Sequence, residues 1–287
     1  MKSPLGLEAR LPVFELFKDA LFLLWAKRSR LVTMFLPIIV VLVVLDQYST
    51  AVSNAFIESM DPERAAEYSA PMLQFLFVTL ISMLLSILLA TTVHRFSLQD
   101  SSHWPKNALR LPNRYDWRYL WRSIVISLAA AAAGTIAIML FGGVTGALLG
   151  GGDPEAMKGT IGLAIIPGVM LMLYIVARLS VTLPEIAIGT EGSDLGRAWR
   201  MSKGNGSRLV IVVMALPLLV NLPFLALFAV ENVVANIIAA FGVYSMTLIS
   251  ITVLSLSYQF LVEFYEPEES ENVVPEADPK DDSSLDA

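Results

Sequence analysis

The most patterned polar stretch of this sequence runs from Arg178 to Arg208, between two apolar runs. Two opposite charges, Arg178 and Glu185, flank the proline at position 184. They could form an ion pair at a membrane edge, and an ion pair buried there would be a functional candidate. In the alternative arrangement, Arg178 extends to lipid phosphates and Glu185 is solvated. The sequence leaves both arrangements open.

The second half of this stretch predicts a short amphipathic helix. Ser193 is suited to cap its start and Gly204 to end it. Acids precede the helix and bases follow toward its C-terminal end, as the helix dipole favours. Seven residues of the whole stretch are therefore candidates to contact lipid headgroups or a partner protein: Arg178, Glu185, Arg197, Trp199, Arg200, Lys203 and Arg208.

Residues for catalysis or metal binding are scarce elsewhere. The chain has no cysteine and only two histidines, His94 and His103. Its one glycine triplet, at positions 150–152, precedes Asp-Pro and not the Lys-Ser/Thr of a phosphate-binding loop. We therefore expect no catalytic residue, no metal and no cofactor, although an enzymatic activity stays open. The basic loops lie beside apolar runs, which favours lipid headgroups over nucleic acid as their partner.

Composition places the chain in a membrane. Of 287 residues, 55% are hydrophobic and 16% are charged, whereas soluble domains carry about 25% charged residues. The runs predict an all-α, polytopic membrane helix bundle, with six transmembrane helices arranged as three hairpins and interfacial amphipathic helices on the cytoplasmic side. The predicted spans are 31–45, 72–93, 124–149, 161–176, 209–230 and 233–262.

The N-terminal region predicts a helix that lies in the membrane interface. Pro12 can begin it, and apolar residues follow at helical spacing as far as Leu24. The first span, with fifteen residues, gives roughly 22 Å of helix and is short for a hydrocarbon layer of roughly 30 Å. We expect it to borrow residues on both sides, and we interpret residues 46–71 as a loop with at least one helical turn.

Basic residues are distributed unequally between the two sides. Of twenty Lys and Arg residues, six precede residue 31, six lie in 94–122, five lie in 178–208 and one lies in the tail. Only Arg64 and Lys158 fall on the other side. The positive-inside rule then predicts that both termini are cytoplasmic. From residue 263 to 287 the chain has ten acids and one lysine. This predicts a membrane domain at 1–262 and a disordered acidic tail at 263–287.

Two further patterns concern the spans themselves. Gly142, Gly146 and Gly150 recur every four residues and favour close approach of another helix, within the chain or in a homo-oligomer. In the fifth span, Pro217, Asn221 and Pro223 interrupt the helix, as happens in the substrate-binding helices of transporters.

The pattern of the polar stretch resembles a known family. Its elements are Arg178, then Leu-Pro-Glu at 183–185, Gly189, and Ala-Trp-Arg-Met-Ser-Lys-Gly at 198–204. It is similar to the membrane domain attached to some bacterial glycerophosphodiester phosphodiesterases and to related six-span integral membrane proteins. Ala198, Met201 and Ser202 stand where that family has serine, leucine and threonine. The resemblance implies a bacterial inner membrane location. It does not imply phosphodiesterase activity, because we expect no room for the soluble catalytic domain.

These observations favour a membrane module that binds anionic lipid or a partner protein. The alternative is a transporter or a lipid-translocating protein with a site near the broken fifth span.

Overall fold

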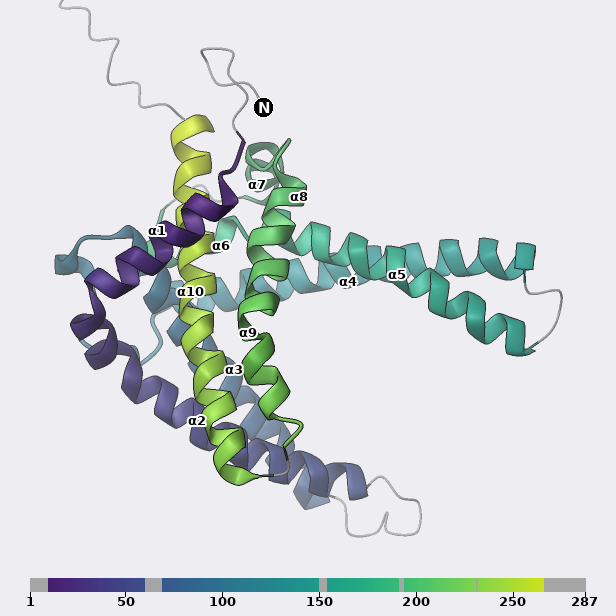
Figure 1. The fold of residues 1–287 in the computed structure, drawn as a ribbon, viewed down its shortest axis with the longest axis horizontal. Helices are drawn as coiled ribbons and strands as arrows, with labels where there is room; N and C mark the ends of the chain where they lie inside the picture. The colour runs from purple at the N-terminus through teal and green to yellow at the C-terminus, as the bar shows by residue number, and fades with distance from the viewer. Residues whose placement is uncertain (1–9, 60–68, 150–153, 191–193, 231, 266–287) are drawn as a thin grey trace, which may run out of the picture.

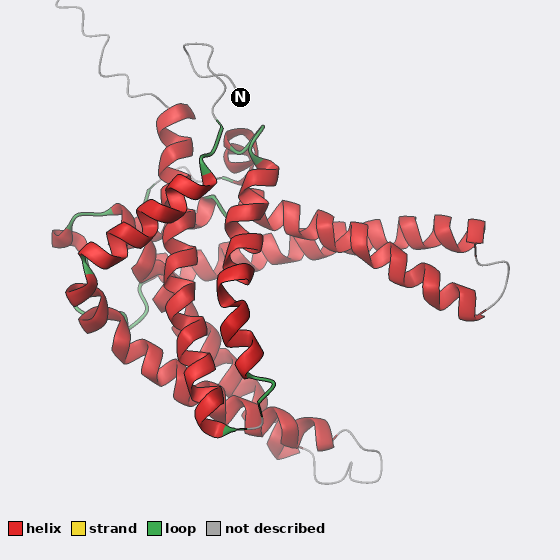
Figure 2. Cartoon of the chain, in the orientation of Figure 1, coloured by secondary structure: helices red, strands yellow, loops and turns green. Residues whose placement is uncertain are grey.

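The computed structural model describes residues 10–59, 69–149, 154–190, 194–230 and 232–265, and every regular element in them is helical (Figure 2). Six helical segments are long and apolar enough to cross a membrane, which confirms a polytopic helix bundle. These segments are Arg28–Asn54, Met72–Leu98, Arg114–Gly146, Ala164–Ile188, Gly206–Leu227 and Val233–Phe264. The chain is thus a multi-pass membrane protein.

The long helices pair as three hairpins that meet at one end (Figure 1). The pairs are α2 (Arg28–Ser59) with α3 (Ser69–Leu98), α4 (Arg114–Leu149) with α5 (Pro154–Leu179), and α9 (Leu216–Leu227) with α10 (Val233–Tyr265). Helix α10 is central and also contacts α1, α2, α3, α6 and α7. The α4–α5 hairpin projects away from the other two pairs (Figure 1).

The short elements gather where the hairpins meet. They are α1 (Val13–Ala26), the 3-10 helix η2 (Ser101–His103), α6 (Thr182–Ile188), α7 (Leu195–Met201) and α8 (Gly206–Val210). All of them belong to the segments that carry most of the lysines and arginines. We call this end of the molecule the basic end.

Helix α1 has the amphipathic form that the sequence predicts. It starts after Pro12 and buries Leu16, Ala20 and Leu24 against the rest of the protein. Phe14 and Phe22 lie on its exposed surface together with Trp25, as suits a helix at a membrane surface.

The first span is longer than we predicted. Helix α2 continues without a break through the polar residues that follow Leu45 and ends at Ser59. The interpretation of residues 46–71 as mainly loop is therefore wrong for its first half. Thr50 donates from its hydroxyl to the Asp46 carbonyl at 3.0 Å, so one of these polar side chains is paired within the helix itself.

The α4–α5 contact uses different glycines from those we singled out. A Cβ on Gly168 would lie 2.9 Å from the Gly134 carbonyl oxygen and 2.3 Å from Ile138 Cγ1. A Cβ on Gly142 would make an ordinary contact with Ala164, and one on Gly146 would meet nothing within 4 Å. Gly150 lies outside the described residues. Within the chain, the close helix approach is therefore made at Gly134 and Gly168, because these two face each other across the hairpin.

This difference predicts unequal effects of the same substitution. Gly168→Ala should lower the stability of the detergent-solubilised protein by about 1–3 kcal/mol, because the added methyl group overpacks the hairpin. Gly146→Ala is the matched control and should leave stability unchanged or raise it by about 0.4–1 kcal/mol. Thermal unfolding in one detergent compares them. Equal melting temperatures would contradict the close approach at Gly168.

Candidate functional site at the basic end

Arg178 lies in the last turn of α5 and is buried among groups of α5 and α7. Its Nε donates to Ser202 Oγ at 2.9 Å, and its Nη2 donates to the Trp199 carbonyl oxygen. The guanidinium lies 3.5 Å from the centroid of the Trp199 ring and also faces Tyr174. A planar cation that stacks on an indole and bonds a carbonyl is well suited to arginine and poorly suited to lysine. Arg178 therefore joins the end of α5 to α7.

Glu185 pairs with Arg197 and not with Arg178. The Glu185 side chain is buried in α6, and Arg197 Nη1 donates to its Oε1. Neither of the two arrangements considered for Arg178 and Glu185 is present. The pair links α6 to α7 across residues 191–193. Removal of one partner would leave the other charge buried and uncompensated.

Capping and turn residues mark the two ends of helix α7. Asp194, and not Ser193, is its N-cap residue, since its carboxylate accepts from the Arg197 N–H at 2.8 Å. Ser193 itself lies outside the described residues. Gly204 adopts a φ of 85°, so the predicted glycine stop after this helix is confirmed.

The segment after Gly204 binds the start of the described chain. Asn205 Oδ1 accepts from the Leu11 N–H at 2.8 Å, and Arg208 Nη1 donates to the Leu11 carbonyl oxygen at 2.7 Å. Both polar groups of one buried backbone residue are thus satisfied by residues that lie almost two hundred positions later. These two bonds hold the residue that precedes α1 against α8.

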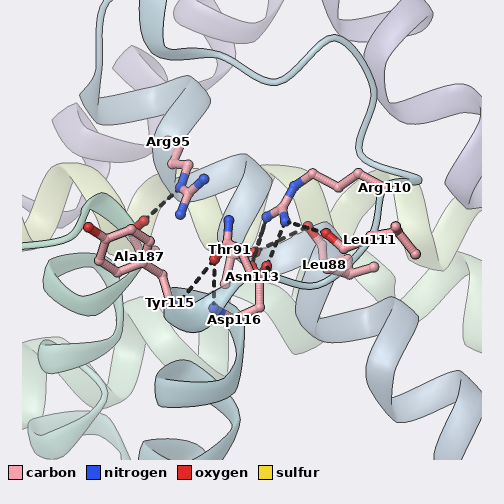
Figure 3. Close-up of polar contacts among 9 residues, drawn as sticks. All are labelled: Leu88, Thr91, Arg95, Arg110, Leu111, Asn113, Tyr115, Asp116 and Ala187. Carbon is pink, nitrogen blue, oxygen red and sulfur yellow. Dashed lines mark hydrogen bonds and ion pairs between the residues drawn. The ribbon is translucent and has the colours of Figure 1, made fainter.

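A second buried ion pair, which the sequence reading did not identify, lies where α3 meets the start of α4 (Figure 3). Arg110 donates from Nη1 and Nη2 to both carboxylate oxygens of Asp116, at 2.6 and 2.7 Å. Thr91 Oγ1 donates to the same carboxylate at 2.7 Å, and the Asn113 N–H donates at 2.7 Å. Asn113 Oδ1 accepts in return from the Asp116 N–H at 3.3 Å. This reciprocal exchange resembles a capping box, so the Asn-x-x-Asp spacing was the available signal.

Helix α3 also satisfies the C-terminal carbonyl groups of α6. Arg95 Nε donates to the Ala187 carbonyl oxygen at 2.7 Å (Figure 3). Gln99, which follows α3, donates from Nε2 to the Ile188 carbonyl oxygen at 3.2 Å. These are orphan acceptors at a helix end, where a cation is favoured. Gly189 then turns the chain with a φ of 86° against the Tyr115 ring.

His94 occupies a structural position between three spans. It is fully buried, with Nδ1 at 2.8 Å from Ser255 Oγ of α10 and Nε2 at 3.2 Å from Tyr119 Oη of α4. Among the residues that the structure describes, no group of three His, Asp or Glu side chains could hold a metal ion. The geometry of His94 is that of a bridge between helices.

Two exposed arginines, Arg118 and Arg200, lie beside exposed tryptophans. A pocket of about 320 Å³ is lined by Trp117, Arg118, Trp121 and Arg122 of α4 and by Ile186 of α6. Trp117 and Trp121 are 55% and 67% exposed. Trp199 and Arg200 on α7, and Lys203 just after it, are also exposed. Of the seven residues singled out in the polar stretch, these three are therefore the ones on the surface.

The fifth span is irregular just before the predicted place, and the helix is not interrupted at Pro217, Asn221 and Pro223, which all lie within α9. A π-helical turn at Ile211–Ala215 precedes α9, next to Pro217, which cannot donate a backbone hydrogen bond. Asn221 Nδ2 donates to the Pro217 carbonyl oxygen at 2.8 Å. The missing N–H of Pro217 accounts for the irregular turn before α9, and Asn221 bonds within the regular helix that follows. A transport role for Pro217, Asn221 and Pro223 stays a prediction.

Comparison of the chain with family models, curated proteins and solved structures finds no match.

The Asp116 pair yields a stability prediction. Asp116→Asn should lower stability by about 3 kcal/mol, because it leaves the Arg110 guanidinium with a neutral partner in a mostly buried site. Adding Arg110→Gln should recover part of that loss, since the unpaired charge is then gone. Thermal unfolding of the two variants and the parent checks this. A double variant less stable than Asp116→Asn would contradict the pairing.

Proposed function

We propose that this protein is a lipid-binding module of the bacterial inner membrane that recognises anionic phospholipid headgroups at its basic end. Both termini then lie in the cytoplasm, as the distribution of lysine and arginine predicts. The observation that carries the proposal is the exposed Arg118 beside the exposed indole rings of Trp117 and Trp121, in the pocket between α4 and α6.

The arginines of the basic end fall into two classes, which supports this choice. Arg110, Arg178, Arg197 and Arg208 bond to carboxylates, hydroxyls or carbonyl groups of the protein. Arg118 and Arg200 instead lie on the surface, beside exposed tryptophans. Tryptophan prefers the membrane–water interface, and cations there attract anionic lipid. We therefore expect these surface cations to lie at headgroup level.

The proposed surface is smaller than the one expected from the polar stretch. Arg178, Glu185, Arg197 and Arg208 hold the helices together, whereas Trp199, Arg200 and Lys203 remain available to lipid. Helix α4 adds Trp117, Arg118 and Trp121, which lie outside that stretch. A link to the phosphodiesterase-associated membrane domain remains a prediction from the motif.

The test removes two surface cations and measures lipid selectivity. The double variant Arg118→Gln/Arg200→Gln should lose affinity for spin-labelled phosphatidylglycerol relative to phosphatidylcholine, by roughly fivefold for each cation at low salt. The matched control, Arg64→Gln/Lys158→Gln, removes equal charge from the predicted opposite side. Its selectivity should stay near that of the parent. Equal losses in both double variants, or no preference in the parent, would overturn the proposal.

A further inference from the structure

An apolar groove at the junction of α1, α2 and α10 has the size of a ligand site. Its volume is about 340 Å³, within the range of about 300–1,000 Å³ that is usual for small-molecule pockets. Its walls are mainly aliphatic and aromatic side chains from the three helices, among them Leu21, Leu24, Val32, Leu36, Phe241 and Leu248. Such walls suit a hydrocarbon chain.

One charged residue, Arg28, lines this groove among the residues that the structure places there. Arg28 is exposed at the start of α2, where α1 ends. Its guanidinium lies 5.4 Å from the Trp25 ring, and Nη1 donates to the Trp25 carbonyl oxygen at 3.3 Å. That bond is at the long end of the normal range and occupies one of five N–H donors. The remaining donors can bind a phosphate.

The neighbouring cations point elsewhere. Lys27 lies over the Trp104 ring at 4.8 Å, and Arg30 lines a separate polar pocket of about 80 Å³ together with Lys106. Arg28 therefore lines the groove and Arg30 does not, although they are two residues apart on one helix.

We propose that this groove holds one acyl chain of an anionic phospholipid, with the lipid phosphate bound at Arg28. The inference rests on the proposed lipid-binding role and assigns it a defined site. A peptide segment would bring backbone N–H and C=O groups that need partners in an apolar environment. The one hydroxyl on the groove wall, that of Ser245, already donates to the Phe241 carbonyl oxygen at 2.8 Å. An acyl chain carries no such requirement.

Native mass spectrometry of the full-length protein tests the site. The protein is supplied with equal amounts of phosphatidylglycerol and phosphatidylcholine that have the same acyl chains. The parent should retain one phosphatidylglycerol under activation that removes the other lipids. Arg28→Gln should lower that retained fraction by about fivefold. Arg30→Gln, which removes the same charge outside the groove, should leave the fraction unchanged.

A second pair of variants tests the acyl-chain part of the site. Ser245→Phe places a ring in the groove and should abolish the retained lipid. Ile238→Phe adds bulk to an exposed position of α10 outside the groove and should not. Thermal unfolding confirms that each variant is folded. Retention by Ser245→Phe, equal losses in Arg28→Gln and Arg30→Gln, or retention of detergent in place of lipid would overturn the assignment.

The two proposals fail in different ways. If the groove is empty but the Arg118 and Arg200 surface still selects anionic lipid, only the groove assignment fails. If one phosphatidylglycerol is retained at Arg28 while removal of Arg118 and Arg200 changes nothing, the surface of α4 and α7 is not the recognition site.

Discussion

Arginine side chains that end on backbone carbonyl groups hold the basic end of this protein together. In a membrane, a polar group without a partner costs several kcal/mol, so every helix end at this level needs a donor or an acceptor from the protein. Arg178 bonds the Trp199 carbonyl, Arg95 bonds that of Ala187, and Arg208 bonds that of Leu11. The first two bonds join a long helix to a short one, and the third joins α8 to the residues that precede α1.

These bonds explain why three hairpins can diverge from one place. The α4–α5 hairpin contacts α3, α6, α7 and α8, near the basic end. There, His94 joins α3 to α10 and to α4. Asp116, which is paired with Arg110, joins the start of α4 to Thr91 of α3. The distal parts of the hairpins rely instead on close packing, as Gly134 and Gly168 show. Polar bonds therefore join the hairpins near the basic end, and close packing joins the two helices of a hairpin farther from it.

The same arrangement separates structural from exposed cations. The buried guanidinium groups bond to other groups of the protein, whereas Arg28, Arg118 and Arg200 lie at the surface beside tryptophans. A high count of basic residues on one side thus does not measure how many can contact lipid. We place lipid recognition on this smaller exposed set.

Much of the fold follows from local patterns in the sequence. Apolar length predicts the six spans, the spacing after Pro12 predicts α1, and Gly204 predicts the end of α7. The partners of Arg178 and Glu185 could not be predicted in this way. Arg178, Glu185 and Arg197 lie on three successive helices, α5, α6 and α7. Which of their charges meet therefore depends on the tertiary position of α7. Gly142 and Gly146 have the right spacing for close packing, but α5 approaches Gly142 only to an ordinary contact distance and does not approach Gly146.

Amide hydrogen exchange in the polar stretch tests the central claim most directly. Arg178→Met keeps an apolar stem of similar length but removes the bonds to Trp199 and Ser202. Peptides covering 195–202 should then lose protection, while peptides covering 80–90 in α3 should keep it, because only the first set depends on that guanidinium. Unchanged protection across 195–202 would show that packing alone holds α7, and would contradict the role assigned to the buried arginines.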